Sequence, residues 1–326
     1  MPVSTRAAAI AWGAARPEDP LPSIVSPDVS ASKRRYSQTT PVAAAKVSPA
    51  KKKKAKKGIK KTAPKPFRPP SDWKATYELV RELRQDRTAP CDRFGCEALM
   101  NLAGPDDEKS RRFYALVALM LSSQTKDAVV AHAMQSMHED GVLSVDGILA
   151  LPREKLVEEY LLKVGFRNNK AKYLQETCEI LQDEFGSDIP PTAKQMMDLP
   201  GVGPKMAYIC ENAAWRKQSG IGVDTHMHRI FPKLGWVDKQ SKTPDHTRLA
   251  LQSWLPQKYW GDVNLLWVGF GQEVQQFPGK IMEKALSCSN PEKAIKLLKK
   301  CGMVVGRIAQ RHGMGERYRE VIKAKK

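Results

Sequence analysis

Lys205 and Asp224 stand nineteen residues apart in the sequence and could together break an N-glycosidic bond. A lysine amine is a nucleophile toward the sugar carbon C1′, and a fixed carboxylate stabilises the oxocarbenium-like transition state of that reaction. Asp224 precedes a helical pattern, so we expect it to cap a helix, where the positive end of the helix dipole keeps the carboxylate ionised. Taken alone, a lysine at position 205 is more often a phosphate contact, so this hypothesis depends on the pair.

The segment Leu199–Gly203 (LPGVG) predicts a tight hairpin directly before this lysine. Two glycines, Gly201 and Gly203, bracket the apolar residue Val202. Glycine allows positive φ and lets a phosphate approach the backbone, and the helix that follows begins with its positive dipole end at the same point. The hairpin could therefore hold a DNA backbone without reading bases. The alternative is an ordinary turn between two helices, which the full string LPGVGPKMA disfavours.

The elements that must position these residues are predicted to be helices. From Trp73 onward, apolar residues recur at spacings of three and four and are separated by Gly, Pro, Asn and Asp. No segment offers a convincing alternation of β-branched residues, so we expect an all-α protein of some ten short helices. Asn290 should cap one of them. The clearest helical runs are Phe113–Leu121, Leu156–Val164, Tyr173–Leu181 and Met206–Ala214.

The positive charge of the chain is concentrated at its start. The 326 residues carry 54 Lys and Arg against 35 Asp and Glu, a net charge of +19, of which residues 1–70 contribute +13. Residues 1–70 are poor in large apolar side chains, which predicts a disordered basic tail. The runs Lys33–Arg35 and Lys51–Lys61 are typical of nuclear-localisation signals or nucleic-acid arms, and residues 1–17 weakly match a mitochondrial presequence. A merely solvated tail is the alternative.

Composition argues against two classes of protein. No run approaches the ~18–20 consecutive apolar residues of a transmembrane helix, so no membrane partner is expected. Six cysteines are scattered through a lysine-rich chain without a secretory signal, so a reducing compartment is favoured over a disulfide scaffold. We expect the protein to be a monomer.

Four motifs, in register and in order, resemble those of endonuclease III, a bifunctional DNA glycosylase of the helix–hairpin–helix superfamily. The similarity runs from about residue 111 to residue 271. It implies a two-lobed helical helix–hairpin–helix glycosylase fold, with Lys205 as the Schiff-base lysine and Asp224 as the essential aspartate. It also implies excision of oxidised pyrimidines from duplex DNA, followed by β-elimination. The motifs are Leu121–Asp127 (LSSQTKD), Val164–Phe166 (VGF), Leu199–Ala207 (LPGVGPKMA) and Val223–Ile230 (VDTHMHRI).

The resemblance further implies a set of DNA contacts. Gln124 matches the family glutamine that fills the gap left by an extruded base, and Phe166 falls where the family has an apolar wedge. Chemistry on a stacked base does require extrusion, and something must then occupy the hole. A capping or surface amide is the alternative for Gln124, a core aromatic for Phe166, and a simple helix-face residue for His228. The expected DNA-contacting residues are Gln124, Phe166, Leu199, Gly201, Val202, Gly203, His226 and Arg229.

One departure from the family concerns iron. Family members commonly bind a four-iron cluster through C-x6-C-x2-C-x5-C in the C-terminal part, whereas after Gly271 this chain has only Cys288 and Cys301. Two thiolates cannot complete a four-cysteine set, so we expect no cofactor and no metal. The lysines at 293–300 could supply the basic DNA contacts that the cluster loop normally provides.

We therefore expect three parts: the tail 1–70, a terminal helical domain of 71–113 plus 229–326, and a helical module at 114–228 that contains the hairpin. The expected partner is double-stranded DNA with damaged pyrimidines or abasic sites, in the nucleus and also in the mitochondrion. Two alternatives stay open. The 8-oxoguanine glycosylase branch usually has a β-rich N-terminal domain and a different string after the aspartate. A non-catalytic helix–hairpin–helix DNA-binding protein has no reason to keep Lys205 and Asp224 together.

Overall fold

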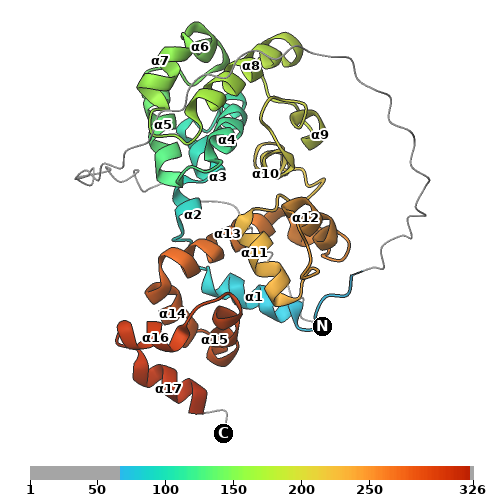
Figure 1. Cartoon of the computed structure of the whole chain (residues 1–326). Coiled ribbons are helices and arrows are strands. Elements are labelled where there is room, and N and C mark those ends of the chain that lie inside the picture. The colour runs from blue at the N-terminus through green and yellow to red at the C-terminus, as the bar shows by residue number, and fades with distance from the viewer. Residues whose placement is uncertain (1–66, 324–326) are drawn as a thin grey trace, which may run out of the picture. The chain divides into compact units, whose positions relative to one another are not determined.

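A computed structural model describes residues 67–323, and every regular element within them is a helix (Figure 1). The all-α class predicted from apolar spacing is confirmed, although these residues form seventeen α-helices rather than some ten. Within this described range, no helix combines the length and the apolar character that a membrane span requires. The predicted basic tail lies outside the described residues, apart from residues 67–70.

The helices from α3 to α10 form one group around an apolar core that runs from Leu99 to Ala214 (Figure 1). The central helix is α4, in which every residue from Phe113 to Leu121 is buried. The bounds are α3 Cys96–Leu99, η1 Met100–Leu102, α4 Glu108–Ser122, α5 Asp127–Glu139, α6 Val145–Ala150, α7 Arg153–Lys155, η2 Leu156–Tyr160, α8 Arg167–Phe185, α9 Ala193–Met196 and α10 Pro204–Trp215.

A second group combines α1 with the helices from α11 to α17 around a core of its own. Trp236 is buried there, with the ring centroids of Phe231 and Trp267 at 5.1 and 4.8 Å. The bounds are α1 Trp73–Leu83, α11 Thr225–Leu234, α12 Pro244–Gln252, η3 Gln257–Tyr259, α13 Trp260–Gln276, α14 Pro278–Ser287, α15 Pro291–Lys300, α16 Val305–Arg311 and α17 Gly315–Lys323.

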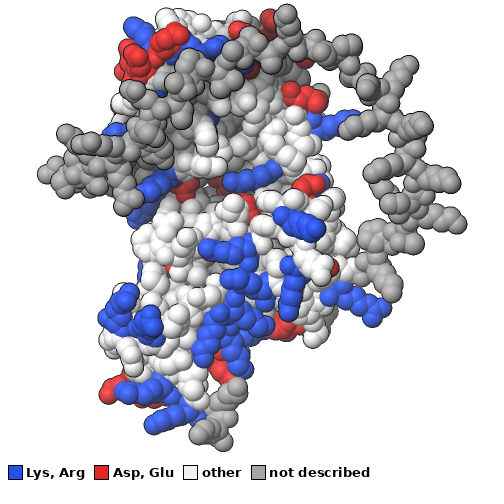
Figure 2. All heavy atoms as spheres, viewed as in Figure 1, with Lys and Arg blue, Asp and Glu red and all other residues white. Residues whose placement is uncertain are grey.

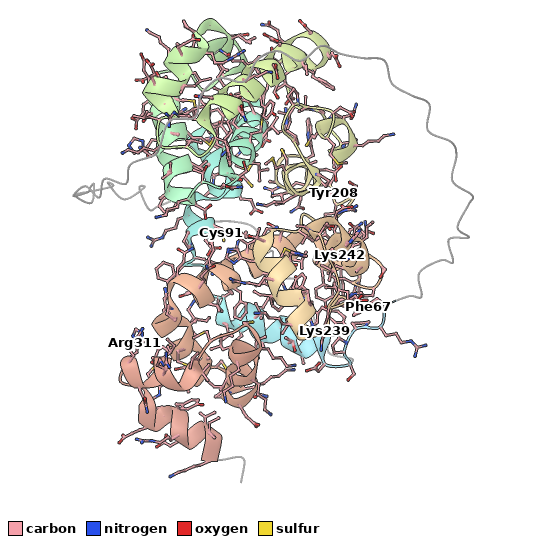
Figure 3. The ribbon with its side chains drawn as sticks, in the orientation of Figure 1. Phe67, Cys91, Tyr208, Lys239, Lys242 and Arg311 are labelled. Carbon is pink, nitrogen blue, oxygen red and sulfur yellow. The ribbon has the colours of Figure 1, made fainter. Side chains whose placement is uncertain are left out.

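The short helix α2 (Pro90–Phe94) joins the two groups, and its Cys91 lies at their junction (Figure 3). Beside it, the buried Arg84 forms ion pairs at 2.7 Å with both Asp92 of α2 and Glu273 of α13. Losing Arg84 would leave the buried carboxylates of Asp92 and Glu273 without their shared cation, which is strongly destabilising. The ion pairs of Arg84 therefore fix α2, the link between the two cores, to α13 of the second core.

The chain passes from one core to the other between Leu83 and Leu99 and again between Ala214 and Ile221. These changeovers differ from the boundaries at 113/114 and 228/229 that the sequence suggested. The described residues 67–323 fall within one compact unit, so their division into separate domains stays a prediction.

Three of the four predicted apolar helices are present, within α4, α8 and α10. The prediction for Leu156–Val164 is wrong beyond Tyr160, where η2 ends as a single π-helical turn. Contacts with another part of the chain explain the break. Gly165 donates its N–H to Thr125 Oγ1, and Phe166 takes a left-handed conformation before α8 begins. At the other end of the molecule, the Asn290 cap is confirmed because its side chain accepts from the backbone N–H of Lys293.

Candidate active site and DNA interface

The hairpin of residues 199–203 exposes backbone rather than side chains. Gly201 has φ of +75°, as its glycine predicts, whereas Gly203 is extended and caps α10. The N–H groups of Gly201 and Gly203 have no hydrogen-bond acceptor within residues 67–323, so both can donate to an anion at the start of α10. The side chains of Leu199 and Val202 are only 3% and 6% exposed and pack in the first core. Any DNA contact at these two residues must come from their backbone.

Lys205 and Asp224 lie at the starts of two helices, α10 and α11. Lys205 is the second residue of α10, and Asp224 is the N-cap of α11. The predicted cap is confirmed, because Asp224 Oδ1 accepts from the N–H of Met227 at 2.8 Å. A Cβ atom on Gly222 would lie 2.8 Å from the carbonyl oxygen of Lys205. Only glycine fits that gap, and it brings the segment that enters α11 directly against the first turn of α10.

The charges at this junction act on one another. Burial lowers the pKa of His226, and the nearby Asp224 opposes that shift. Burial raises the pKa of Asp127, while a 2.7 Å hydrogen bond from Gln272 and the charge of Lys205 act in the opposite direction. Lys205 is therefore within electrostatic reach of the carboxylate of Asp127 and of an imidazole that is neutral at pH 7. Asp224 acts on the same two groups, so the four side chains form one cluster.

Gln124 and Phe166 share an uncommon backbone conformation. Their φ angles are +49° and +56°, in the left-handed region that non-glycine residues occupy at a cost. Both side chains are exposed, Phe166 by 58%, so the core-aromatic alternative for Phe166 is wrong. The N-cap of α5 is Lys126, so Gln124 does not cap that helix. A Cβ on Gly165 would lie 2.5 Å from the carbonyl oxygen of Gln124, so the two loops are in close contact.

A hollow of about 160 Å³ connects these loops to the hairpin. Its lining comes from the α4–α5 loop, the start of α8 and the hairpin itself. The same surface therefore carries the exposed phenylalanine, the exposed glutamine loop and the free N–H groups of the hairpin. The lining residues are Met120, Ser123, Phe166, Asn169, Lys170, Tyr173 and Gly201.

Two further polar side chains, His228 on α11 and Tyr208 on α10, have partners of their own. His228 bonds Thr247 Oγ1 through Nδ1 at 2.8 Å, which supports its helix-face interpretation. Tyr208, on α10, instead faces α12, where the guanidinium of Arg248 lies 5.2 Å from its ring centroid (Figure 3). Neither His228 nor Tyr208 belongs to the charged cluster around Lys205.

Arg229 lies on the exposed side of α11 and belongs to a second basic feature. Arg229, Lys233 and Lys300 all act electrostatically on the thiol of Cys301, whose pKa burial raises to about 12. We call these three residues the basic edge. Within the described residues none of them forms an ion pair with a carboxylate. Figure 2 shows Lys and Arg side chains gathered over α11 and α15 on this face.

The other lysines of α15 are engaged within the protein. Lys293 pairs with Asp72 at 3.8 Å, and Lys296 pairs with Glu292 at 2.6 Å. The ammonium of Lys299 lies 5.9 Å from the ring centroid of Tyr318. Of the lysines at 293–300 that the sequence suggested as DNA contacts, only Lys300 belongs to the basic edge.

The cysteines do not fit a four-iron cluster. Cys288 is half-buried and donates its thiol proton to the carbonyl of Ala285, while Cys301 is buried. No group of three His, Cys, Asp or Glu side chains that could hold a metal ion occurs between residues 67 and 323, which include all six cysteines. The thiolates needed for cluster binding would be costly at Cys301, because burial favours its protonated form.

The sequence reasoning missed three polar residues of this region. Asp127 stands inside the LSSQTKD motif but was given no role, and its partner Gln272 is 145 residues away in the chain. Lys170 is buried at 6% exposure on the apolar face of α8. A signal for Lys170 was available, because the buried residues Leu174 and Cys178 follow it at intervals of four.

Comparison with known proteins identifies what this arrangement resembles. Residues 117–257 match the family described as "HhH-GPD superfamily base excision DNA repair protein". The chain is 43% identical over 214 residues to "Endonuclease III-like protein 1" of Gallus gallus, covering 66% of this chain and 75% of that protein. It is 44% identical over 208 residues to "Endonuclease III homolog" of Schizosaccharomyces pombe, covering 63% of this chain and 57% of that protein.

Among solved structures, one titled "Structure of a non-covalent Endonuclease III-DNA Complex" shares the fold. The TM-score is 0.55 at 24% identity, over 71% of this chain and 96% of that chain. The described helices therefore adopt the fold that the motifs implied.

Proposed function

The chain belongs to the endonuclease III family of base excision repair DNA glycosylases, and from this premise we propose that it excises oxidised pyrimidines from duplex DNA and then cleaves the strand as an abasic-site lyase. The observation that carries the proposal is the junction of α10 and α11. There Lys205 lies in the first turn of α10 and Asp224 caps α11, the segment that enters α11 lies against that first turn, and the hairpin beside them has two free N–H groups. A protein that only binds DNA gains nothing from this charged cluster.

In the proposed reaction, Lys205 is the nucleophile and Asp224 the stabilising anion. The lysine amine attacks C1′ of the damaged nucleotide, the bond to the base breaks, and the base leaves with the bonding electron pair. Loss of the amine proton and opening of the sugar give an imine between Lys205 and C1′. Removal of a C2′ proton then expels the 3′ phosphate by β-elimination, and hydrolysis of the imine frees the enzyme. The carboxylate of Asp224, held by its cap bond, faces the positive charge that develops on the sugar.

The proposed DNA path uses the two exposed loops and the hairpin together. The free N–H groups of Gly201 and Gly203 bind a phosphate, Gln124 enters the gap left by the extruded base, and Phe166 wedges against the opposite strand. The hollow that Phe166 and Gly201 line, together with Ser123 beside Gln124, supports this assignment. Arg229, and with it the rest of the basic edge, would bind the backbone farther along the duplex.

We further propose that this member of the family works without an iron–sulfur cluster, as a monomer. The support is chemical: the C-terminal region offers two thiols, of which Cys301 is buried among apolar side chains. The two basic runs of the first 66 residues support nuclear import, with a mitochondrial fraction as a second destination. Import of fluorescent fusions with and without Lys51–Lys61 would test the location.

Trapping with borohydride tests the proposed function directly. Reduction of the imine should link the wild-type protein covalently to a duplex that contains one oxidised pyrimidine. Lys205→Gln should lose both base release and trapping while its duplex affinity stays within a few-fold. Lys217→Gln, just beyond the other end of α10, is the matched control and should trap like the wild type.

Each contrary outcome is informative. Trapping by Lys205→Gln would mean that another amine forms the imine. Base release without trapping in the wild type would leave a glycosylase without lyase activity. Binding without either reaction would favour a non-catalytic helix–hairpin–helix protein.

A further inference from the structure

Lys170 is a buried cation for which the proposed chemistry has no use. It lies in the first turn of α8, on the helix face that buries Ala171, Leu174 and Cys178. Within the described residues no carboxylate pairs with it, and burial lowers its pKa to about 8. Burying an ammonium without a counter-ion is costly, and an apolar side chain of similar length would pack there at no such cost. The charge therefore needs a compensating role.

All three donors of the Lys170 ammonium are used by the end of α4 and the loop that follows it. Nζ donates to the carbonyl of Leu121 at 2.7 Å, to the carbonyl of Ser123 at 2.6 Å and to Thr125 Oγ1 at 3.0 Å. An ammonium has three protons, so none is left for a phosphate or a substrate. Lys170 thus acts on the chain that carries Gln124 and not directly on DNA.

The loop after α4 is also held by the loop before α8. Thr125 Oγ1 also accepts from the N–H of Gly165 at 3.1 Å. Gly165 has no side chain, which lets it pass close to the carbonyl of Gln124. Gln124 and Phe166 both have a left-handed backbone. Each is therefore next in sequence to a residue that shares the hydrogen bonds at Thr125 Oγ1, Gln124 to Thr125 itself and Phe166 to Gly165. A left-handed backbone is unfavourable for a non-glycine residue and persists only where its surroundings enforce it.

We propose that Lys170 is a positioning residue that presets Gln124 and Phe166 for insertion into the duplex before DNA binds. A loop that is already ordered does not lose its conformational freedom at the moment of base extrusion, so more of the binding energy is available to hold the duplex open. This inference rests on the proposed roles of Gln124 and Phe166. It adds that their conformation is set by a buried ammonium on α8.

The test compares a reaction that needs the inserted residues with one that does not. Excision of an oxidised pyrimidine from a duplex requires extrusion and gap filling, whereas lyase cleavage at an abasic site in a single strand has no gap to fill. Lys170→Met removes the three donors and keeps the length and apolar packing of the side chain. The ratio of the duplex rate to the single-strand rate should fall at least tenfold, measured in single turnover with enzyme in excess over DNA but below the concentration that saturates binding.

Two further variants separate positioning from folding. Lys172→Met, two residues along α8 and exposed beside Glu176, is the matched control and should leave the ratio unchanged. Because Lys170 is proposed to act through the loop, Gln124→Ala combined with Lys170→Met should lower the ratio no further than the more severe single change. If Lys170→Met fails to fold, Thr125→Val, which removes the shared acceptor at a half-buried position, must give the same selective loss.

The inference is overturned if Lys170→Met leaves the ratio unchanged, if it slows both reactions equally, or if its effect adds to that of Gln124→Ala. The wild type separates this failure from failure of the proposed function. A wild-type protein inactive on both substrates would contradict the proposed function, whereas an active wild type with an unchanged variant would contradict only the role of Lys170.

Discussion

At the scale of single residues, Asp224 combines two tasks in one carboxylate. Its Oδ1 atom satisfies the N–H of Met227, and the N-terminus of α11 favours the negative charge that the proposed reaction needs. The two tasks can be separated because asparagine caps a helix as well as aspartate does but carries no charge.

Asp224→Asn should therefore fold normally and lose turnover. We expect the single-turnover rate of base excision to fall by at least about 10²–10³-fold, the range found when one stabilising electrostatic group is removed from an active site. The melting temperature should change little because the cap bond is kept. Rapid-quench kinetics and thermal unfolding measure the two effects, and a rate close to that of the wild type would leave Asp224 as a cap only.

At the scale of elements, local signals predicted what local contacts determine. The spacing of apolar residues gave α4, α8 and α10, and the residue types at 224 and 290 gave two caps, because these features depend on neighbours within one or two turns. The end of η2 was missed because its cause is Thr125, forty residues from Gly165. The acceptors of Lys170 lie 45 to 49 residues before it. Its burial could therefore be predicted from the local apolar spacing, but its hydrogen bonds could not.

The helices α11 and α15 allow a prediction about the basic edge. Replacing Lys233 and Lys300 together by glutamine should reduce the salt dependence of duplex binding, because each lost phosphate contact removes about 0.9 from the slope of log K against log salt. The slope should fall in magnitude by about 1.8 if both lysines contact phosphates. Fluorescence anisotropy across a salt series measures this slope.

The control uses lysines of the same helix that are already paired. Lys293 and Lys296, changed together to glutamine, should affect the slope less because Asp72 and Glu292 already engage them. An equal change in both double variants would mean that only the net charge of the protein matters and that the basic edge is no specific contact.

The C-terminal helices also allow a direct test of the metal assignment. Purified protein should show no broad absorbance near 400 nm and no stoichiometric iron, because α14 to α16 and their connections offer only the thiols of Cys288 and Cys301. Iron analysis by mass spectrometry measures this. Four iron atoms per chain would show that remote cysteines supply ligands.

At the scale of the whole molecule, two cores meet where the proposed chemistry takes place. Lys205 belongs to a helix of the first core and Asp224 to a helix of the second, and Asp127 is bonded across the junction to Gln272 of α13. Lys205 and Asp224 could be identified from the sequence because each lies in a short contiguous motif. The sequence could not show Asp127 joining them, since that depends on how the two groups of helices pack.

The basic tail should add affinity for DNA without adding to the chemistry. Deleting residues 1–66 removes 15 Lys and Arg residues but none of the proposed site residues, and it keeps Pro70, whose carbonyl accepts from the N–H of Trp73 at the start of α1. Single-turnover excision on a short oligonucleotide at saturating enzyme should therefore stay close to that of the full chain. Nonspecific affinity for long duplex DNA should fall, and its salt dependence should flatten by about 0.9 in slope for each phosphate that the tail neutralises. A truncated protein that binds saturating DNA but no longer cleaves it would make the tail part of the catalytic structure.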